Sequence, residues 1–201
     1  MMKKGMIMLL VLCLALTSAN ALAEDSKADV TDFKSFYWGA SMEDVKAIEG
    51  EPITTGEVSG LDAEYIVYET SAVGFDMILA YYFCDDGLFQ VRYILNEEHS
   101  NDSLFIDDYE KFRNALTKKY GEPLIDKVSW DDSSTKKYYE ENGKSMGDAL
   151  RYGYCSYLTR YDLERSYISM DMSADNYEVS MTVNYESKTV DPGETDYSDE
   201  I

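Results

Sequence analysis

Histidine, cysteine and positive charge are all scarce in this sequence. Its 201 residues include one histidine and three cysteines, which excludes a histidine-rich metal site and argues against a Ser-His-Asp triad. Lys and Arg number 18 against 39 Asp and Glu, so the formal net charge is −21 at pH 7. Because such a chain repels phosphate backbones and anionic lipid headgroups, we expect neither nucleic-acid binding nor peripheral membrane attachment.

Apolar and aromatic residues, by contrast, are plentiful enough for a folded protein. The chain is 45% hydrophobic and contains 18 tyrosines, which is too apolar for a disordered polymer despite its charge. Its length suits one domain, or two small halves that share a core.

The first 23 residues have the three parts of an export signal. Lys3 and Lys4 form a positive start, residues 6–16 are apolar, and an A-x-A site ends at Ala23, which predicts cleavage before Glu24. The alternative is a membrane anchor, but the apolar run is shorter than the roughly 20 residues that cross a bilayer. We therefore expect a secreted or extracytoplasmic protein that has no membrane attachment after cleavage.

Two cysteines, Cys84 and Cys155, remain after this cleavage. A disulfide between them would close a loop of about 70 residues and stabilise the fold by a few kcal/mol. The alternative is two separate buried thiols that act as small hydrophobic groups. Cys13, in the apolar run, lacks the small preceding residue that lipidation requires, so no lipid anchor is expected.

Helix and strand signals occur twice along the chain. The first helix is predicted from Ser41 to Gly50, and the second begins at Asp107 and Asp108 and ends at Gly121. After each helix the period changes to two, with β-branched and aromatic residues, which predicts strands at 64–69, 75–84, 88–95, 154–161, 167–172 and 177–185.

The repeated order predicts an α+β protein of two tandem units, each a short helix followed by an antiparallel β-meander. Residues 24–100 form the first predicted unit and residues 101–187 the second. The second unit contains a polar insertion near 130–147, which we expect to be a loop. Residues 188–201 are acidic and contain Pro192 and Gly193, so they predict a disordered tail.

The spacing Gly39-x-Ser41-x-x-x-Val45-x-x-x-x-Gly50-x-Pro52 resembles a signature of small exported bacterial proteins. These include the SmpA/OmlA-like outer-membrane assembly lipoproteins and the β-lactamase-inhibitory-protein-like family, which has two tandem copies. The segments around Trp38 and around Lys119 to Pro123 resemble a still closer group of uncharacterised exported Gram-positive proteins. The resemblance implies a tandem fold and a protein-binding role, inhibitor-like or envelope-associated, without catalytic residues.

The insertion carries the candidate binding residues. Trp130, Tyr138 and Tyr139 are aromatic residues close to the charges of residues 136–137 and 140–141. Exposed aromatic side chains surrounded by charge are typical of protein interfaces. The alternative is an insertion that folds back on the sheet.

Other polar groupings have a structural interpretation. The carboxylate pairs at 85–86, 107–108 and 131–132 suit turns and helix starts, although a hydrolase would also need paired carboxylates. The spacing Asp171-x-Ser173-x-Asp175 resembles a calcium loop, but it lacks the glycine and glutamate of one and predicts a hairpin turn. His99 lies in a polar connector and is expected to be solvated.

We therefore predict a secreted, non-enzymatic module that binds another extracellular or envelope protein through its sheet face or its insertion. No catalytic residue, metal site or cofactor is predicted. A carboxylate-dependent extracellular hydrolase and a weak binder of cations or small molecules are the alternatives.

Overall fold

The computed structural model describes residues 32–193. The predicted signal peptide and the last eight residues of the predicted tail lie outside this range. The described chain contains, in order, α1 (Met42–Glu49), β1 (Thr54–Glu57), β2 (Glu64–Ala72), β3 (Phe75–Cys84), β4 (Gly87–Leu95), α2 (Ser103–Tyr120), β5 (Ile125–Trp130), α3 (Ser133–Glu141), α4 (Met146–Arg151), β6 (Cys155–Asp162), β7 (Ser166–Asp175) and β8 (Glu178–Ser187).

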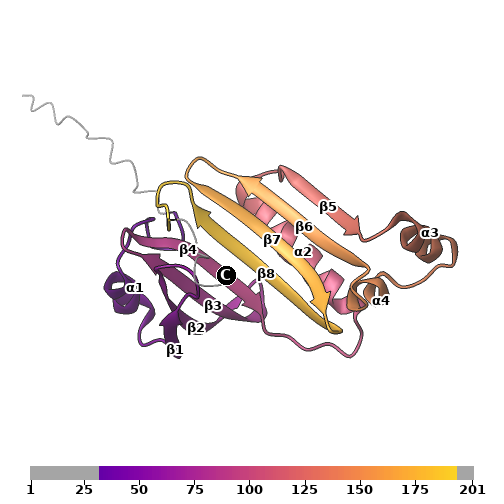
Figure 1. The fold of residues 1–201 in the computed structure, drawn as a ribbon, viewed down its shortest axis with the longest axis horizontal. Helices are drawn as coiled ribbons and strands as arrows, with labels where there is room; N and C mark the ends of the chain where they lie inside the picture. The colour runs from indigo at the N-terminus through magenta and orange to yellow at the C-terminus, as the bar shows by residue number, and fades with distance from the viewer. Residues whose placement is uncertain (1–31, 194–201) are drawn as a thin grey trace, which may run out of the picture. The chain divides into compact units, whose positions relative to one another are not determined.

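All eight strands belong to one antiparallel sheet, in the order β1-β2-β3-β4-β8-β7-β6-β5. Each of the stretches β1–β4 and β5–β8 is a meander, and β4 pairs with β8 in the middle (Figure 1). The predicted α+β class is confirmed. Because the sheet is continuous, it does not by itself divide the chain into two units, and the tandem organisation stays a prediction.

Local sequence accounts for the helix ends. Ser41 and Asp44 form the reciprocal capping box of α1, and Val45 is its one buried residue. Gly50 ends α1 at a φ of 91°, a backbone conformation that glycine adopts without strain. Helix α2 begins at Ser103, four residues before the predicted start, because Phe105 extends the apolar face toward the N-terminus.

The core lies between the helices and one face of the sheet. Helix α2 runs across this face beneath β6 and β7 (Figure 1), and it buries Phe105, Tyr109, Phe112 and Leu116. The opposite face carries half-buried side chains, together with Tyr167, which is 50% exposed. No helix of residues 32–193 covers this second face, which we call the open face.

Several buried tyrosines of the core place their hydroxyls in internal hydrogen bonds. Tyr81 donates to Glu49 Oε1 at 2.6 Å, and the Tyr109 hydroxyl lies 2.7 Å from Thr159 Oγ1. Buried polar groups need such partners, since an unpaired one costs about 1–3 kcal/mol. Tyrosines whose hydroxyls have such internal partners therefore stabilise the fold, and their hydroxyls are not available to a ligand.

These buried phenols predict a loss of stability in alkali. Burial raises the pKa of Tyr93 and of Tyr157 to about 12, from an ordinary value of 10.0. Because the folded chain holds these protons more tightly than the unfolded chain, the stabilisation is complete below pH 10 and is lost between pH 10 and 12. Each tyrosine contributes a slope of up to about 1.4 kcal/mol per pH unit. Urea unfolding across this range checks the prediction, and a flat stability profile would contradict it.

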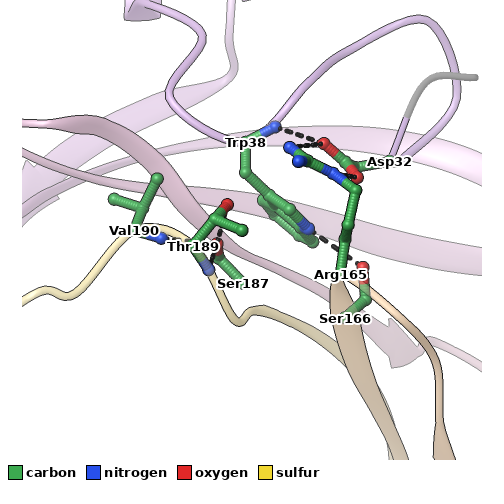
Figure 2. Close-up of polar contacts among 7 residues, drawn as sticks. All are labelled: Asp32, Trp38, Arg165, Ser166, Ser187, Thr189 and Val190. Carbon is green, nitrogen blue, oxygen red and sulfur yellow. Dashed lines mark hydrogen bonds and ion pairs between the residues drawn. The ribbon is translucent and has the colours of Figure 1, made fainter.

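The segment before α1 is clasped to the turn before β7 by four residues (Figure 2). Asp32 accepts a hydrogen bond from the Trp38 N–H at 2.9 Å and forms an ion pair with Arg165 at 2.7 Å. The Trp38 indole Nε1 donates to Ser166 Oγ at 2.9 Å. Trp38 and Ser166 are 128 positions apart, so Trp38 ties the start of the described chain to its second meander.

Part of the predicted acidic tail is held against this clasp. The Ser187 hydroxyl accepts hydrogen bonds from the backbone N–H groups of Thr189 and Val190 (Figure 2). Lys188 pairs with Asp162, and Val190 packs against the core. The prediction of disorder is therefore wrong for residues 188–190.

The prediction that residues 130–147 form a loop is also wrong, because most of this segment is helical. Asp132 caps α3 by accepting a hydrogen bond from the Thr135 N–H at 2.8 Å, and Ser145 caps α4. Hydrogen bonds from the Ser134 hydroxyl and from the hydroxyl and N–H of Thr135 hold the pKa of the Asp132 carboxyl well below its ordinary value. Helix α3 is too polar to show a helical period, so its capping residues are its clearest signal.

Candidate functional site

Six aromatic side chains meet at one end of the second meander. They come from the end of β5, from α3, from the connection between α4 and β6, and from the turn between β7 and β8. We call them the tyrosine surface: Trp130, Tyr138, Tyr139, Tyr152, Tyr154 and Tyr177.

The rings form one continuous chain of contacts. The ring centroids of Tyr139 lie 5.7 Å from Trp130, 5.9 Å from Tyr138 and 5.9 Å from Tyr154. The Tyr152 ring lies 5.9 Å from Tyr154 and 5.7 Å from Tyr177. All five separations fall in the range of favourable aromatic pairs, so each ring holds its neighbour in place.

The residues of the tyrosine surface differ in exposure, and only the exposed ones can contact a ligand. Tyr138 is 53% exposed, Tyr152 55%, Tyr154 40% and Tyr177 61%. Tyr139 is only 9% exposed. Its prediction as an exposed binding residue is therefore wrong, because its ring is covered by the neighbouring rings.

The two remaining predicted binding residues have different places in this surface. Trp130 is half-buried and packs its ring against that of Tyr139. Tyr138 is exposed, as expected. The structure thus brings all three predicted residues together, but it leaves only Tyr138 fully available to a ligand.

The exposed tyrosines keep their hydroxyls free of protein partners. Within residues 32–193, no hydrogen bond forms to the hydroxyl of Tyr138, Tyr152, Tyr154 or Tyr177. Core tyrosines such as Tyr109 do the opposite. An apolar ring with an unoccupied hydroxyl offers a ligand both contact area and a hydrogen bond.

Tyr177 occupies a strained backbone position at the tip of the β7–β8 hairpin. Asp175 pairs with Glu178, and the two residues between them, Asn176 and Tyr177, have φ of 49° and 68°. Such a turn favours glycine at its second central position. Strain of this kind is stored at functional sites more often than elsewhere, and here it directs a 61% exposed ring toward Tyr152.

The tyrosine surface contains two adjoining hollows. The first has a volume of about 450 Å³ and is lined by Ser134, Thr135 and the tyrosines at 138, 139, 152 and 154. The second, of about 320 Å³, lies between the same Tyr152 and Tyr154 and the β7–β8 turn with Asp175 and Tyr177. Tyr152 and Tyr154 therefore form a ridge shared by both hollows.

Charged groups frame these hollows. Arg151 lines the second hollow but donates to Asp102 at 2.7 Å. Asp175 forms no ion pair with any residue between 32 and 193, and its carboxylate accepts only from Asn176 Nδ2 at 3.3 Å. The second hollow thus presents one unneutralised carboxylate.

The other groupings singled out from the sequence have local roles or polar partners. Asp85 and Asp86 lie in the β3–β4 turn, and Asp132 caps α3. Asp171 and Ser173 lie within strand β7. No group of three or more His, Cys, Asp and Glu residues in the described range is placed to hold a metal ion.

The expectation that His99 is solvated is wrong, because its side chain is largely buried. Its Nε2 lies 2.5 Å from Asp108 Oδ2, with 17% and 14% of the two side chains exposed, and its ring packs on Phe105 at 4.6 Å between centroids. His99 therefore ties the connector after β4 to α2.

The two cysteines are free thiols, so the disulfide alternative does not hold in this structure. Cys84 ends β3 and Cys155 begins β6, with three strands between them in the sheet. Four strand spacings of about 4.8 Å make a separation of roughly 19 Å, far beyond the ~7 Å limit for a disulfide.

Their reactivities should differ. Cys155 is 2% exposed, and burial raises its thiol pKa to about 11, while Cys84 is half-buried. In folded protein comprising residues 24–201, we expect Ellman's reagent to modify Cys84 and spare Cys155, and both to react after unfolding. Mass spectrometry without reductant identifies the modified residue. Equal reaction of both thiols in the folded protein would contradict the prediction.

Three residues of the tyrosine surface were missed in the sequence. Tyr152 and Tyr154 are separated by one glycine between α4 and β6, and Tyr177 follows Asn176 in a hairpin turn. For Tyr177, the sequence did offer a signal: Asn-Tyr stands at a hairpin turn where Asn-Gly is preferred, which indicates a residue kept for a reason other than the turn.

The fold and the site together define an antiparallel α+β protein with an exposed tyrosine surface at one end of its sheet. No helix of the described residues is long and apolar enough to cross a membrane. Comparison of the chain with family models, curated proteins and solved structures produced no match.

Proposed function

We propose that this chain is a non-enzymatic, extracytoplasmic module that binds another protein through its tyrosine surface. One observation carries the proposal: four exposed tyrosines belong to one array of ring contacts. The buried ring of Tyr139 contacts two of them, Tyr138 and Tyr154, and Tyr152 links Tyr154 to Tyr177. Tyrosine and tryptophan are enriched among the residues that contribute most to binding energy in protein interfaces.

The array would bind at low entropic cost. Association loses about 0.5–1.5 kcal/mol for each flexible side chain that it immobilises. Tyr152 contacts rings on both sides, and Tyr154 contacts Tyr139 and Tyr152. Since these neighbours already restrict the rings, most of that loss occurs during folding, and the surface is prepared for a partner.

Extracytoplasmic location is the part of the proposal that rests on sequence. It is supported by the positive start, the apolar run and the A-x-A site of residues 1–23. The acidic composition then supports solubility and favours basic partners.

We also propose that the two meanders are tandem units, as the resemblance to exported bacterial proteins implies. Helix α1 precedes β1–β4, and α2 precedes β5–β8, with α3 and α4 inserted between β5 and β6. The same Gly-Glu-Pro sequence directly follows α1 and α2. In this proposal, the insertion that carries Tyr138 is the feature that gives the second unit its binding role.

The test is affinity capture with matched variants. Residues 24–201 are immobilised as wild type, Tyr152→Ala and Tyr167→Ala, and each is exposed to the same extracellular and envelope extracts. Tyr167 is a suitable control because it is 50% exposed but lies on the open face of β7. A protein recovered with wild type and Tyr167→Ala but not with Tyr152→Ala supports the proposal. Identical recovery with all three contradicts it.

A further inference from the structure

We propose that the partner segment is an extended, proline-rich peptide with a basic residue, bound across the two hollows of the tyrosine surface. This inference rests on the proposed function, because it specifies what the same surface binds. Three features carry it: the shared aromatic ridge, the free hydroxyls and the unpaired carboxylate of Asp175.

The ridge suits a polyproline II helix. This helix has three residues per turn and presents its rings as separate ridges that dock between aromatic side chains. Here Tyr152 and Tyr154 lie 5.9 Å apart with an angle of 31° between ring planes, and one hollow opens on each side. A single extended chain can thus place one proline-containing turn in each hollow.

The hydroxyls supply the polar contacts that such a peptide needs. Polyproline II has no internal hydrogen bonds, so its backbone carbonyl groups need donors from the protein that binds it. Tyr138, Tyr152, Tyr154 and Tyr177 each have an uncommitted O–H within this surface. Tyrosine O–H groups can donate to carbonyls while the rings contact proline.

The carboxylate of Asp175 determines why the peptide carries a basic residue and where that residue binds. Asp175 lines the second hollow without an ion-pair partner in the described chain, whereas Arg151 is occupied by Asp102. The whole chain carries a net charge of −21. A Lys or Arg next to the prolines is therefore attracted over a long range and then paired locally with Asp175.

The experiment uses folded protein of residues 24–201 and two fluorescent peptides of about ten residues. One peptide alternates prolines with small residues and has a terminal Arg-Lys pair, and the other has every proline replaced by alanine. Fluorescence anisotropy measures both affinities. We expect saturable binding of the proline peptide and at least tenfold weaker binding of the alanine peptide.

Variants then locate the binding. Tyr154→Ala should weaken binding of the proline peptide about tenfold or more, Asp175→Asn should weaken it and reduce its salt dependence, and Tyr167→Ala should leave it unchanged. Tyr152→Phe keeps the ring but removes the hydroxyl, so a measurable loss with this variant supports the hydrogen bond. Circular dichroism confirms that each variant is folded.

Several outcomes overturn the inference. These are equal affinity for the two peptides, no binding of either, an unchanged affinity in Tyr154→Ala, or displacement of the peptide by soluble cell-wall oligosaccharides. If no peptide binds while protein capture still depends on Tyr152, the proline-rich inference fails and the proposed protein-binding function stands. If capture is also independent of Tyr152, both fail.

Discussion

Replacing Gly87 with alanine is expected to lower the free energy of unfolding by about 3 kcal/mol or more. Gly87 begins β4 at a φ of 93°, and an added Cβ would lie 2.4 Å from the Gly39 carbonyl oxygen and 2.9 Å from that of Ala40. Both neighbours are backbone atoms. The backbone is held there by two hydrogen bonds, from the Gly39 N–H to the Leu88 carbonyl oxygen and from the Leu88 N–H to the Ala40 carbonyl oxygen. The added methyl group therefore has to separate the segment before α1 from the β3–β4 hairpin.

Gly121→Ala is the matched control for this substitution. Gly121 has a similar φ of 85°, but an added Cβ would meet no atom within 4 Å. It should cost only the conformational penalty of placing alanine at a φ of 85° and a ψ of −169°, about 1–3 kcal/mol. Urea unfolding of both variants separates the two effects, and equal costs would show that the contact between Gly87 and Gly39 carries no energy.

Tyr177→Gly is expected to stabilise the fold and weaken binding. Glycine suits the positive φ of 68°, so the substitution should raise the free energy of unfolding by about 1 kcal/mol. It also removes an exposed ring that contacts Tyr152, so we expect the affinity for the captured partner to fall about tenfold or more. A change that improves stability and impairs binding identifies a residue retained for function.

Tyr177→Ala distinguishes the two contributions. It removes the ring but keeps a Cβ at the strained position, so binding should fall as in Tyr177→Gly without the gain in stability. Thermal unfolding and surface plasmon resonance on the same preparations measure both quantities. Unchanged affinity in both variants would remove Tyr177 from the binding surface.

The parts of the fold that depend on local interactions were predictable from the sequence. The cap of α1 needs only Ser41 and Asp44, which are three residues apart. Strand β3 was predicted with its observed bounds, because its ten residues form a nearly continuous apolar and aromatic run between turn residues. In both cases, the pattern that identifies the element lies within one short segment of the sequence.

The missed elements have weak periodicity because they bury little. Strand β1 (Thr54–Glu57) is an edge strand without a buried residue, and β5 is the opposite edge. Helix α3 buries only Tyr139. A hydrophobic pattern cannot reveal an element whose stability comes from caps, pairing on one side or a single aromatic contact.

The candidate site was predicted only in the part that lies within one segment. Trp130, Tyr138 and Tyr139 are close in sequence, and the structure brings them together. Tyr152 and Tyr177 meet because β7 and β8 pair over ten positions and end beside α4. That meeting depends on the register of the sheet, which no local pattern in either segment specifies.

Chemical footprinting of wild-type protein most directly tests the claim that the tyrosine surface is the binding site. Exposed tyrosines are nitrated in the presence and absence of the captured partner, and each site is quantified by mass spectrometry. We expect protection of Tyr138, Tyr152, Tyr154 and Tyr177, with no change at Tyr167 on the open face. Protection of Tyr167, with the other four modified as in free protein, would place the partner on the sheet and contradict binding at the tyrosine surface.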